Sequence, residues 1–286
     1  MKKIILALTL ALFANLFITP TTYAETAEEY FRQGDQFAEQ GKYEQAIESY
    51  TKLIQLVPNE SVAYYNRGNF YRDLKQNHAA IVDYTKAIEL KPTDFQAYFN
   101  RGKCYESLFQ YDYAILDYTK AIELNPNEIR HYNNRGFFYT QLNHYDEAIL
   151  DFNKAIELDP TDANLYQNRG AAYDYANFPD KALLDFEKAS TLNPQNPSHH
   201  NSLGLVYIRL NKTELALTHF SKAVELNPTN PRIYLLRSFL YHSLNQNEKA
   251  IKDLEIFLIL VDKPNSGVPV QDINDAKRVL QSLNNH

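Results

Sequence analysis

Apolar and small residues recur along this chain with the spacing of helix faces. In the stretch from residue 94 to residue 126, Tyr98, Gly102 and Tyr105 are spaced i, i+4, i+7. That spacing puts the three side chains on one stripe of an α-helix. A second set repeats it further along: Ala114, Tyr118 and Ala121. Two helices are therefore predicted, and the small residues let their axes approach while the aromatic rings fill the space beside them.

The same pattern returns every 34 residues. Counting from residues 27, 61, 95, 129, 163, 197 and 231, the eighth residue is Gly in the first six repeats and the twentieth is always Ala. A proline closes each of the first six repeats, and it stops the second helix because the residue before it is pushed out of the α region. The closing prolines are Pro58, Pro92, Pro126, Pro160, Pro194 and Pro228. Capping residues then predict the next helix start in four repeats: Asp94, Asp162, Asn196 and Asn230.

This pattern resembles the tetratricopeptide repeat, a helix-turn-helix unit of the same length. The resemblance covers residues 27–264, which is 7 × 34 = 238 of 286 residues. The seventh repeat departs from it, with Phe257 at a small position and Asp262 in place of proline. We expect an all-α fold, a right-handed α-solenoid of about seven repeats spanning residues 25–264, in which each hairpin is stabilised by its neighbours.

The C-terminal segment predicts a cap for this array. Residues 263–267 read as a turn or linker, and an apolar stripe follows at Ile273, Ala276, Leu280 and Leu283. Such an amphipathic helix suits the exposed end of a solenoid, which needs a cover with a polar outer face. We therefore assign residues 265–286 to a linker and a capping helix.

Residues 1–24 have the features of a Sec-type signal peptide. Lys2 and Lys3 precede an apolar run of 15 residues, and Thr22-Tyr23-Ala24 supplies small residues three and one before the expected cleavage site. The run is shorter than the roughly 20 residues of a membrane span. We expect an exported protein, periplasmic or secreted, with no membrane insertion of the mature chain; an uncleaved N-terminal anchor is the alternative.

The net charge of the mature chain indicates which classes of partner it can bind. Removing residues 1–24 takes away Lys2 and Lys3 and no acidic residue, which leaves 27 basic and 35 acidic residues. A negative chain has no counter-charge for nucleic acid or an anionic membrane, so neither is expected as a partner.

Cys104 is the only cysteine, so no intrachain disulfide is expected. Its position inside a predicted helix indicates a buried thiol, with an intermolecular disulfide or a reactive thiol as the alternatives.

The family resemblance implies where a ligand would bind. In such arrays the first helices line a concave groove, and the sixth residue of each repeat faces it. That position holds an asparagine in four successive repeats: Asn66, Asn100, Asn134 and Asn168. An asparagine side chain offers an acceptor and two donors, so a row of them could bracket the backbone of an extended peptide. The alternative is that these asparagines are simply solvated.

Aromatic and charged residues beside the row add two further hypotheses. Tyr65 and Phe99 at the fifth position, Phe137 at the ninth and Tyr175 at the thirteenth could anchor a ligand, or could pack on neighbouring helices. A partial match resembles the carboxylate clamp of cochaperones that bind the C-terminus of heat-shock chaperones. It consists of three residues with a nearby cation, and Tyr65 and Asn134 stand where the clamp has basic residues. The matching residues are Asn69, Asn100 and Arg130, with Lys103.

An arginine occupies the seventh position in five repeats: Arg67, Arg101, Arg135, Arg169 and Arg237. We interpret these side chains as structural, with the aliphatic stem along the next helix and the guanidinium at the edge. Glutamates that recur in the second helices indicate a solvated convex face: Glu89, Glu123, Glu157 and Glu225.

The sequence favours a binding protein over an enzyme. Its histidines lack metal-ligand spacing, and we find no phosphate-binding loop, nucleophile elbow or catalytic set. No metal, cofactor or catalytic residue is therefore expected. We predict a scaffold that holds an extended peptide or partner segment in the groove. The alternatives are an assembly platform of an envelope or secretion complex that uses its convex face or its ends, and a self-associating structural protein.

Overall fold

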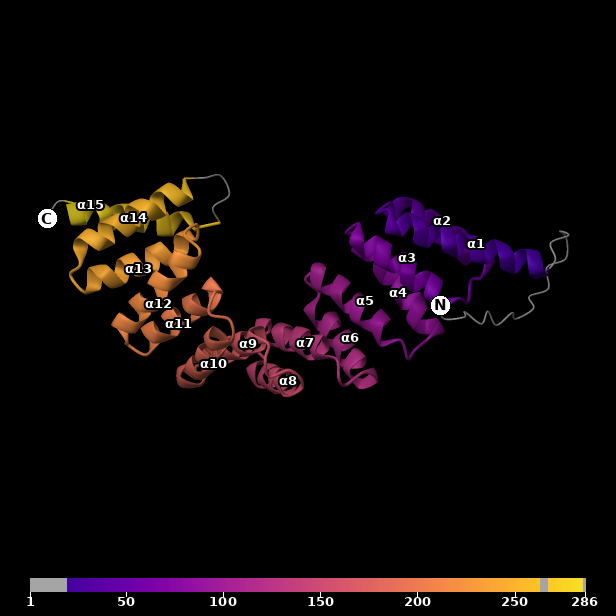
Figure 1. Cartoon of the computed structure of the whole chain (residues 1–286), viewed down its shortest axis with the longest axis horizontal. Coiled ribbons are helices and arrows are strands. Elements are labelled where there is room, and N and C mark those ends of the chain that lie inside the picture. The colour runs from indigo at the N-terminus through magenta and orange to yellow at the C-terminus, as the bar shows by residue number, and fades with distance from the viewer. Residues whose placement is uncertain (1–19, 263–266, 285–286) are drawn as a thin grey trace. The chain divides into compact units, whose positions relative to one another are not determined.

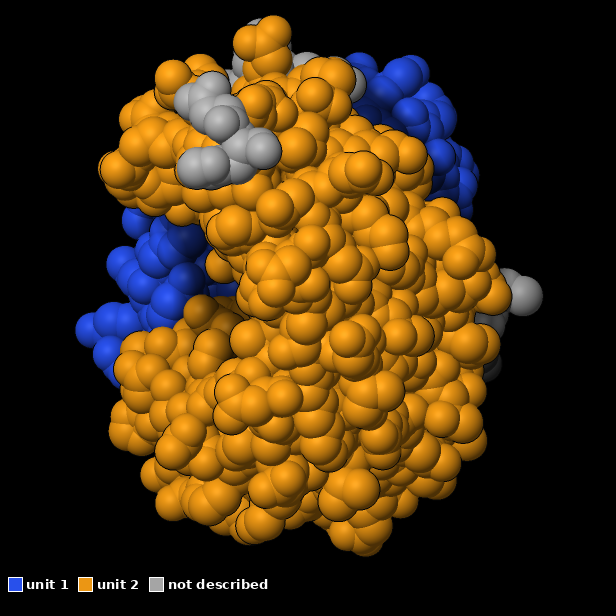
Figure 2. Space-filling view, turned by 90° about the vertical axis from the view of Figure 1, so that its left-hand side faces the viewer, with its two compact units in different colours: residues 1–124 blue, residues 125–286 orange. Residues whose placement is uncertain are grey.

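The computed structural model describes residues 20–262 and 267–284. Within these residues the chain forms fifteen α-helices and no strand, so the predicted all-α repeat solenoid is confirmed. The chain divides into two compact units, residues 1–124 and residues 125–286 (Figure 2). Each unit is built from consecutive antiparallel helix pairs that stack on their neighbours (Figure 1).

The first unit contains three helical hairpins. Their helices are α1 (Pro20–Glu39), α2 (Tyr43–Leu56), α3 (Ser61–Asp73), α4 (Asn77–Leu90), α5 (Phe95–Ser107) and α6 (Tyr111–Leu124). The second unit contains four hairpins and a last helix. Its helices are α7 (Ile129–Gln141), α8 (Tyr145–Leu158), α9 (Ala163–Tyr175), α10 (Pro179–Leu192), α11 (Pro197–Arg209), α12 (Thr213–Leu226), α13 (Pro231–Ser243), α14 (Asn247–Val261) and α15 (Val270–Asn284).

The predicted capping residues begin their helices. The side chain of Asp94 accepts a hydrogen bond from the backbone N–H of Gln96, and Asp162, Asn196 and Asn230 make the same bond two residues ahead. Such bonds satisfy backbone donors that have no partner inside the helix. Pro197 and Pro231 occupy the first turn of α11 and α13, where the missing proline N–H costs nothing.

Each hairpin turns on a left-handed residue at the fifteenth position of its repeat. The φ angle there lies between 56° and 72° in all seven repeats. Glycine adopts such an angle without strain and asparagine tolerates it, and these two types hold five of the seven sites. Lys75 and Phe109 adopt it as well, at 61° and 58°. The turn residues are Gly41, Lys75, Phe109, Asn143, Asn177, Asn211 and Asn245.

In the core of six hairpins, an aromatic ring of the second helix packs against the backbone of a glycine in the first helix. A Cβ atom built on Gly102 would lie 2.9 Å from Cε1 of Tyr118, which is closer than side chains pack. Glycine is therefore required where the Tyr118 ring crosses the first helix. The alanine at the twentieth position is fully buried in every repeat. Rings or leucine fill the twenty-fourth position in the core: Tyr50, Tyr84, Tyr118, Phe152, Phe186, Phe220 and Leu254.

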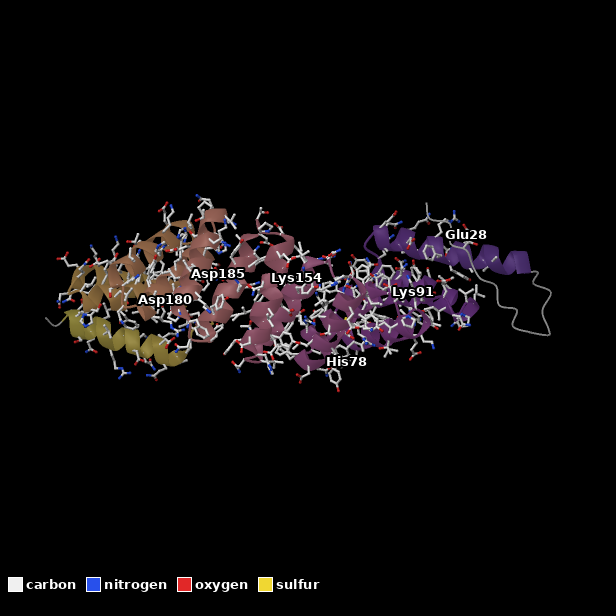
Figure 3. All side chains as sticks on the ribbon, turned by 90° about the horizontal axis from the view of Figure 1, so that it is seen from below. Glu28, His78, Lys91, Lys154, Asp180 and Asp185 are labelled. Atoms are coloured by element: carbon white, nitrogen blue, oxygen red, sulfur yellow. The ribbon has the colours of Figure 1, made fainter. Side chains whose placement is uncertain are left out.

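The arginines of the seventh position are structural, but their guanidinium groups do not lie at the edge as predicted. Each forms a two-pronged ion pair with an aspartate 16 residues later, with Nε–Oδ2 distances of 2.7–2.8 Å and Nη2–Oδ1 distances of 2.6–2.7 Å. The arginine side chains are 13–19% exposed and the aspartates 4–7%. The pairs are Arg67–Asp83, Arg101–Asp117, Arg135–Asp151, Arg169–Asp185 and Arg237–Asp253; Asp185 is labelled in Figure 3.

The interpretation failed because it considered only the aliphatic stem. Each guanidinium also lies over the ring of a tyrosine at the fourth or eleventh position, and Arg67 lies over both, Tyr64 and Tyr71, at 5.9 Å each. This arrangement satisfies a planar cation with a carboxylate and two π faces. In the following text, "Arg–Asp clasp" means this ion pair with its flanking tyrosines.

The last helix covers the end of the second unit. Ala276 of α15 is fully buried against Leu254 and Phe257 of α14, with Ile273, Leu280 and Leu283 packed around it. α15 lies along α14 in Figure 1. This is the predicted capping helix. Most of the linker expected at 263–267 lies outside the described residues.

The N-terminal expectations fall largely outside the described part of the chain. Residues 1–19 of the expected signal peptide are not among the described residues, and α1 begins at Pro20, inside that segment. The described helices include none with the length and apolar character needed to span a bilayer.

Candidate functional site

Three of the four asparagines in the predicted row bond to the preceding repeat. In the first unit, Nδ2 of Asn66 on α3 donates to the hydroxyl of Tyr50 on α2 at 2.9 Å. That hydroxyl donates in turn to Asp35 on α1 at 2.6 Å. Asn66 is half-buried, and its amide orientation is fixed by a bond to the preceding repeat. The expectation that such an asparagine is simply solvated therefore does not describe Asn66.

Three of the predicted site residues meet between α3 and α5. Nδ2 of Asn100 donates to the Tyr65 hydroxyl at 3.0 Å and to Oδ1 of Asn69 at 3.1 Å. Asn69 also accepts from the Tyr84 hydroxyl at 2.7 Å. Burial raises the pKa of Tyr65, which keeps its hydroxyl protonated. Since Nδ2 carries two hydrogens, both donors of Asn100 are used within the protein, and its Oδ1 is the remaining polar atom.

In the second unit the two asparagines of the predicted row differ in their hydrogen bonds. Nδ2 of Asn168 on α9 donates to Oδ1 of Asn133 on α7 at 2.9 Å, not to Asn134. Within the described residues, the side chain of Asn134 has no hydrogen-bond partner. Asn66, Asn100 and Asn168 thus share one feature, an amide that reaches the preceding repeat, whereas Asn134 does not.

Gln167 continues this polar line in the second unit and was not predicted. Its Nε2 donates to Oγ of Ser202 on α11 at 2.7 Å, and its Oε1 lies 3.1 Å from Nδ1 of His199. Gln167 occupies the fifth position of its repeat, as Tyr65 and Phe99 do. The shared position was the signal that could have found it.

The four aromatic residues divide into two kinds. Tyr65 and Phe99 are half-buried, with ring centroids 6.0 Å from Tyr84 and 5.6 Å from Tyr118 respectively. Phe137 is 44% exposed and Tyr175 is 63% exposed. In the second unit, Tyr175 lines an open pocket of about 480 Å³ with Tyr145 and Phe178. Phe137 and Tyr175 therefore offer apolar area to a ligand, and Tyr65 and Phe99 serve mainly as packing.

The residues of the clamp hypothesis are divided between the two units. Asn69 and Asn100 lie together in the first unit, where Oδ1 of Asn69 accepts from Tyr84, Asn100 and, at 3.5 Å, Arg72. Arg130 belongs to the second unit, and its Nε donates to Glu128 at 2.8 Å. Lys103 is exposed on α5.

The second helices carry an exposed aliphatic row that sequence reasoning missed. The twenty-second position of four consecutive repeats holds a leucine or valine that is 65–68% exposed. The equivalent residues of the other repeats are polar: Glu48, Thr218 and Lys252. The predicted solvated glutamates also lie on second helices, and each pairs with the lysine three residues before it. The row consists of Val82 and Leu116 in the first unit and Leu150 and Leu184 in the second.

Metal-ligating and nucleophilic side chains were the remaining candidates for chemistry. Among the described residues, no group of three or more His, Cys, Asp or Glu side chains is placed to hold a metal ion. Cys104 is fully buried, and burial raises the pKa of its thiol to about 11. The thiolate is the nucleophilic form of cysteine, so this side chain is inert at neutral pH.

Models of one repeat family match most of the array. Two models described as "Tetratricopeptide repeat" match residues 61–94, 95–128 and 117–150. A third, described as "TPR repeat", matches residues 34–71, 138–174 and 204–244. No curated protein matches the chain.

Several solved structures share the fold. The chain is 28% identical to MamA over 60% of its length and 94% of the MamA chain, with a TM-score of 0.58. A tetratricopeptide repeat protein from Parabacteroides merdae ATCC 43184 is 19% identical, with coverage of 90% and 99% and a TM-score of 0.66. YrrB, described as a TPR protein with an unusual peptide-binding site, is 23% identical, with coverage of 64% and 94% and a TM-score of 0.57. The last two likenesses bear on the fold alone.

Proposed function

Because the chain belongs to the tetratricopeptide-repeat family, we propose that it binds a partner polypeptide on the first-helix face of its hairpins. Proteins of this family generally mediate protein–protein interactions, and the fold is typically a non-enzymatic scaffold. The ligand is an extended segment of another protein, held through its backbone and a few apolar side chains.

The fixed asparagine amides are the observation that carries this proposal. Asn66, Asn100 and Asn168 are each held by a bond to the preceding repeat. A side chain that is already ordered loses little entropy on binding, which favours affinity. Both donors of Asn100 are used inside the protein, so this residue accepts a backbone N–H through Oδ1 and does not bracket a peptide in both directions.

Exposed aromatic rings on the first helices of the second unit would also contribute to the binding energy. Phe137 on α7 and Tyr175 at the end of α9 present apolar area in the second unit. Large aromatic side chains supply much of the binding energy of protein interfaces. A partner segment with apolar side chains between stretches of plain backbone fits this surface.

The test compares two sets of substitutions within the second unit. The first-helix variant carries Asn168→Ala, Phe137→Ala and Tyr175→Ala, which together remove one described side-chain hydrogen bond, from Asn168 to Asn133. The second-helix variant carries Leu150→Ser and Leu184→Ser at exposed sites. Each is used with the parent chain as an affinity bait in extract of the source cells, after circular dichroism has shown equal melting. Partners are identified by mass spectrometry. Loss of the parent's partners from the first-helix variant alone supports the proposal, and their retention overturns it.

The exposed aliphatic row favours one other candidate, an assembly platform that uses the second-helix face. Each unit carries two exposed apolar side chains at the same position of adjacent repeats, and exposed apolar area of this kind is typical of interaction surfaces. In the same experiment this candidate predicts loss of partners from the Leu150→Ser, Leu184→Ser variant alone. Self-association would instead appear in light scattering as a mass that rises with concentration.

We also propose export through the N-terminal segment, to the periplasm or beyond. The support is the basic start and short apolar run of residues 1–18. Fractionation of cells that carry a C-terminally tagged chain tests it. The expected result is an extracytoplasmic protein that begins at Glu25, and a full-length chain in the cytosol contradicts it.

A further inference from the structure

The sixth repeat lacks the Arg–Asp clasp that the repeats on either side of it share. Among the repeats from residue 61 onward, only this one has Leu203 at the arginine position and His219 at the aspartate position. His200 replaces the tyrosine of the fourth position. Between α11 and α12, two imidazole side chains therefore stand where the repeats on either side have a permanently charged ion pair.

The two rings form a stacked, hydrogen-bonded pair. Nδ1 of His200 lies 3.2 Å from Nδ1 of His219, and the ring planes are 22° apart. Nε2 of His200 lies 3.1 Å from the carbonyl oxygen of Pro194. A carbonyl only accepts, so Nε2 of His200 carries a hydrogen. Of the two Nδ1 atoms one donates and the other accepts, so this bond is lost if both carry a hydrogen.

The pair is linked to the fifth repeat through titratable groups. Tyr207 stacks on His219 at 5.4 Å and donates its hydroxyl to Glu187 on α10 at 3.1 Å. Glu187 stands at the twenty-fifth position of its repeat. In other repeats a neutral side chain at this position accepts a hydrogen bond from the arginine of the following repeat, as Thr51 accepts from Arg67. His199 adds a second link, because its Nδ1 lies 3.1 Å from Oε1 of Gln167 on α9.

The environments of His219 and His199 disfavour the charged form of their rings. Burial and, next, the neighbouring His200 lower the pKa of His219, and Glu187 opposes this shift. Burial likewise lowers the pKa of His199. Two cations of the neighbouring helices are engaged with other groups: Arg237 of α13 is held by Asp253 and Ser221, and Lys188 of α10 lies over the Tyr166 ring. Nε2 of His199 lies 3.2 Å from Nδ2 of Asn196, which only donates, so a hydrogen on this ring nitrogen would set two donors face to face.

We propose that the joint between repeats five and six is a pH-sensitive weak point, closed at neutral pH and opened in mild acid. Histidines kept neutral in the folded state stabilise it above their unfolded pKa of about 6.5 and lose that contribution as the pH falls below this value. In a repeat array only neighbours contact one another. Opening this joint therefore uncouples α11–α15 from the repeats before them and changes how much of the second unit can hold a ligand.

Hydrogen exchange of the full chain at pH 7.5 and pH 5.5 tests this. Protection of α11 and α12, corrected for the intrinsic effect of pH, should fall in acid, by up to about tenfold for each histidine that stays neutral. Peptides from α3–α6, whose one histidine, His78, is exposed, are the internal control and should change less than about twofold. Unchanged protection of α11 and α12 would overturn the proposal.

Two variants separate titration from a merely weak joint. The first installs the clasp of the other repeats through Glu187→Thr, His200→Tyr, Leu203→Arg and His219→Asp. The second, His219→Gln, keeps an amide donor without a titrating ring and serves if the first does not fold. His144→Gln, at an exposed histidine, is the matched control. The acid effect should shrink in the first two and persist in the control; an effect of parental size in His219→Gln would also overturn the proposal.

Discussion

The Arg101–Asp117 pair tests how the hairpins are held together. Two hydrogen bonds of 2.8 and 2.7 Å join the side chains, and Nη1 of Arg101 donates to Thr85 of the preceding repeat at 3.0 Å. Arg101 is 17% exposed and Asp117 is 6% exposed. In Asp117→Asn the guanidinium keeps its charge but loses its counter-charge. Breaking a buried pair in this way costs about 3–5 kcal/mol. Since Arg101 retains some water contact, we expect about 3 kcal/mol.

The same structure predicts that replacing both partners is mild. Leu203 in the sixth repeat shows that the arginine site accepts an apolar side chain, since this leucine is 1% exposed. In Arg101→Met with Asp117→Leu no charge is left without a partner, and the cost should be below about 1.5 kcal/mol. A control on the same helix is Lys120→Gln, which breaks a pair whose members are 45% and 57% exposed. Exposed pairs contribute about 0–1 kcal/mol.

Urea unfolding followed by circular dichroism measures these differences. At a slope of about 3 kcal/mol per M, the Asp117→Asn midpoint should fall by about 1 M. Hydrogen exchange of α5 and α6 checks that the loss is local, because unfolding of a repeat array need not be two-state. An Asp117→Asn midpoint no lower than that of Lys120→Gln would refute the reasoning, as would a double variant as unstable as the single one.

Three further predictions follow from the described packing. Cys104 should react with Ellman's reagent at pH 8 only after urea is added, since its thiol is buried and its pKa is raised to about 11. Gly102→Val should destabilise the chain by at least about 2 kcal/mol in urea unfolding, because its Cβ would already lie 2.9 Å from Tyr118. Truncation after residue 266 should lower the melting temperature and increase light scattering, because it uncovers the apolar residues that pack on Ala276. Fast labelling, unchanged stability or unchanged scattering would contradict each in turn.

The repeat period explains how much of the fold could be predicted from the sequence. Gly102 and Tyr118 are 16 residues apart, and every repeat places a small and a large residue at that distance. Capping residues such as Asp94 mark the helix starts by local chemistry. Features that depend on a single helix could therefore be predicted. The helix pairs follow from the spacing alone.

Features that depend on how two helices cross were not readable. The Arg–Asp clasp also joins residues 16 apart, but nothing in the sequence says that Asp117 points at Arg101 instead of at solvent. The left-handed turn at Phe109 carries no glycine or asparagine to mark it. The tertiary packing fixes both.

The hydrogen bonds of the candidate site residues could not be predicted from the sequence. At the sixth position, Asn100 bonds to two residues of the preceding first helix. The partners differ from repeat to repeat, however: Asn66 bonds to Tyr50 and Asn168 bonds to Asn133. Each choice depends on which side chains the adjacent repeat happens to present, and a regular period cannot specify that.

Site-specific photocross-linking tests the central claim most directly. A photoreactive phenylalanine analogue is placed at one position per experiment in the full chain, in the source cells. Phe137 and Tyr175 probe the first-helix face, and Leu150 and Leu184 probe the second-helix face of the same unit; all four are exposed. The account predicts that a partner polypeptide is cross-linked from Phe137 and Tyr175 and not from Leu150 or Leu184. Adducts that form only from Leu150 and Leu184 would contradict it and place the interaction on the aliphatic row.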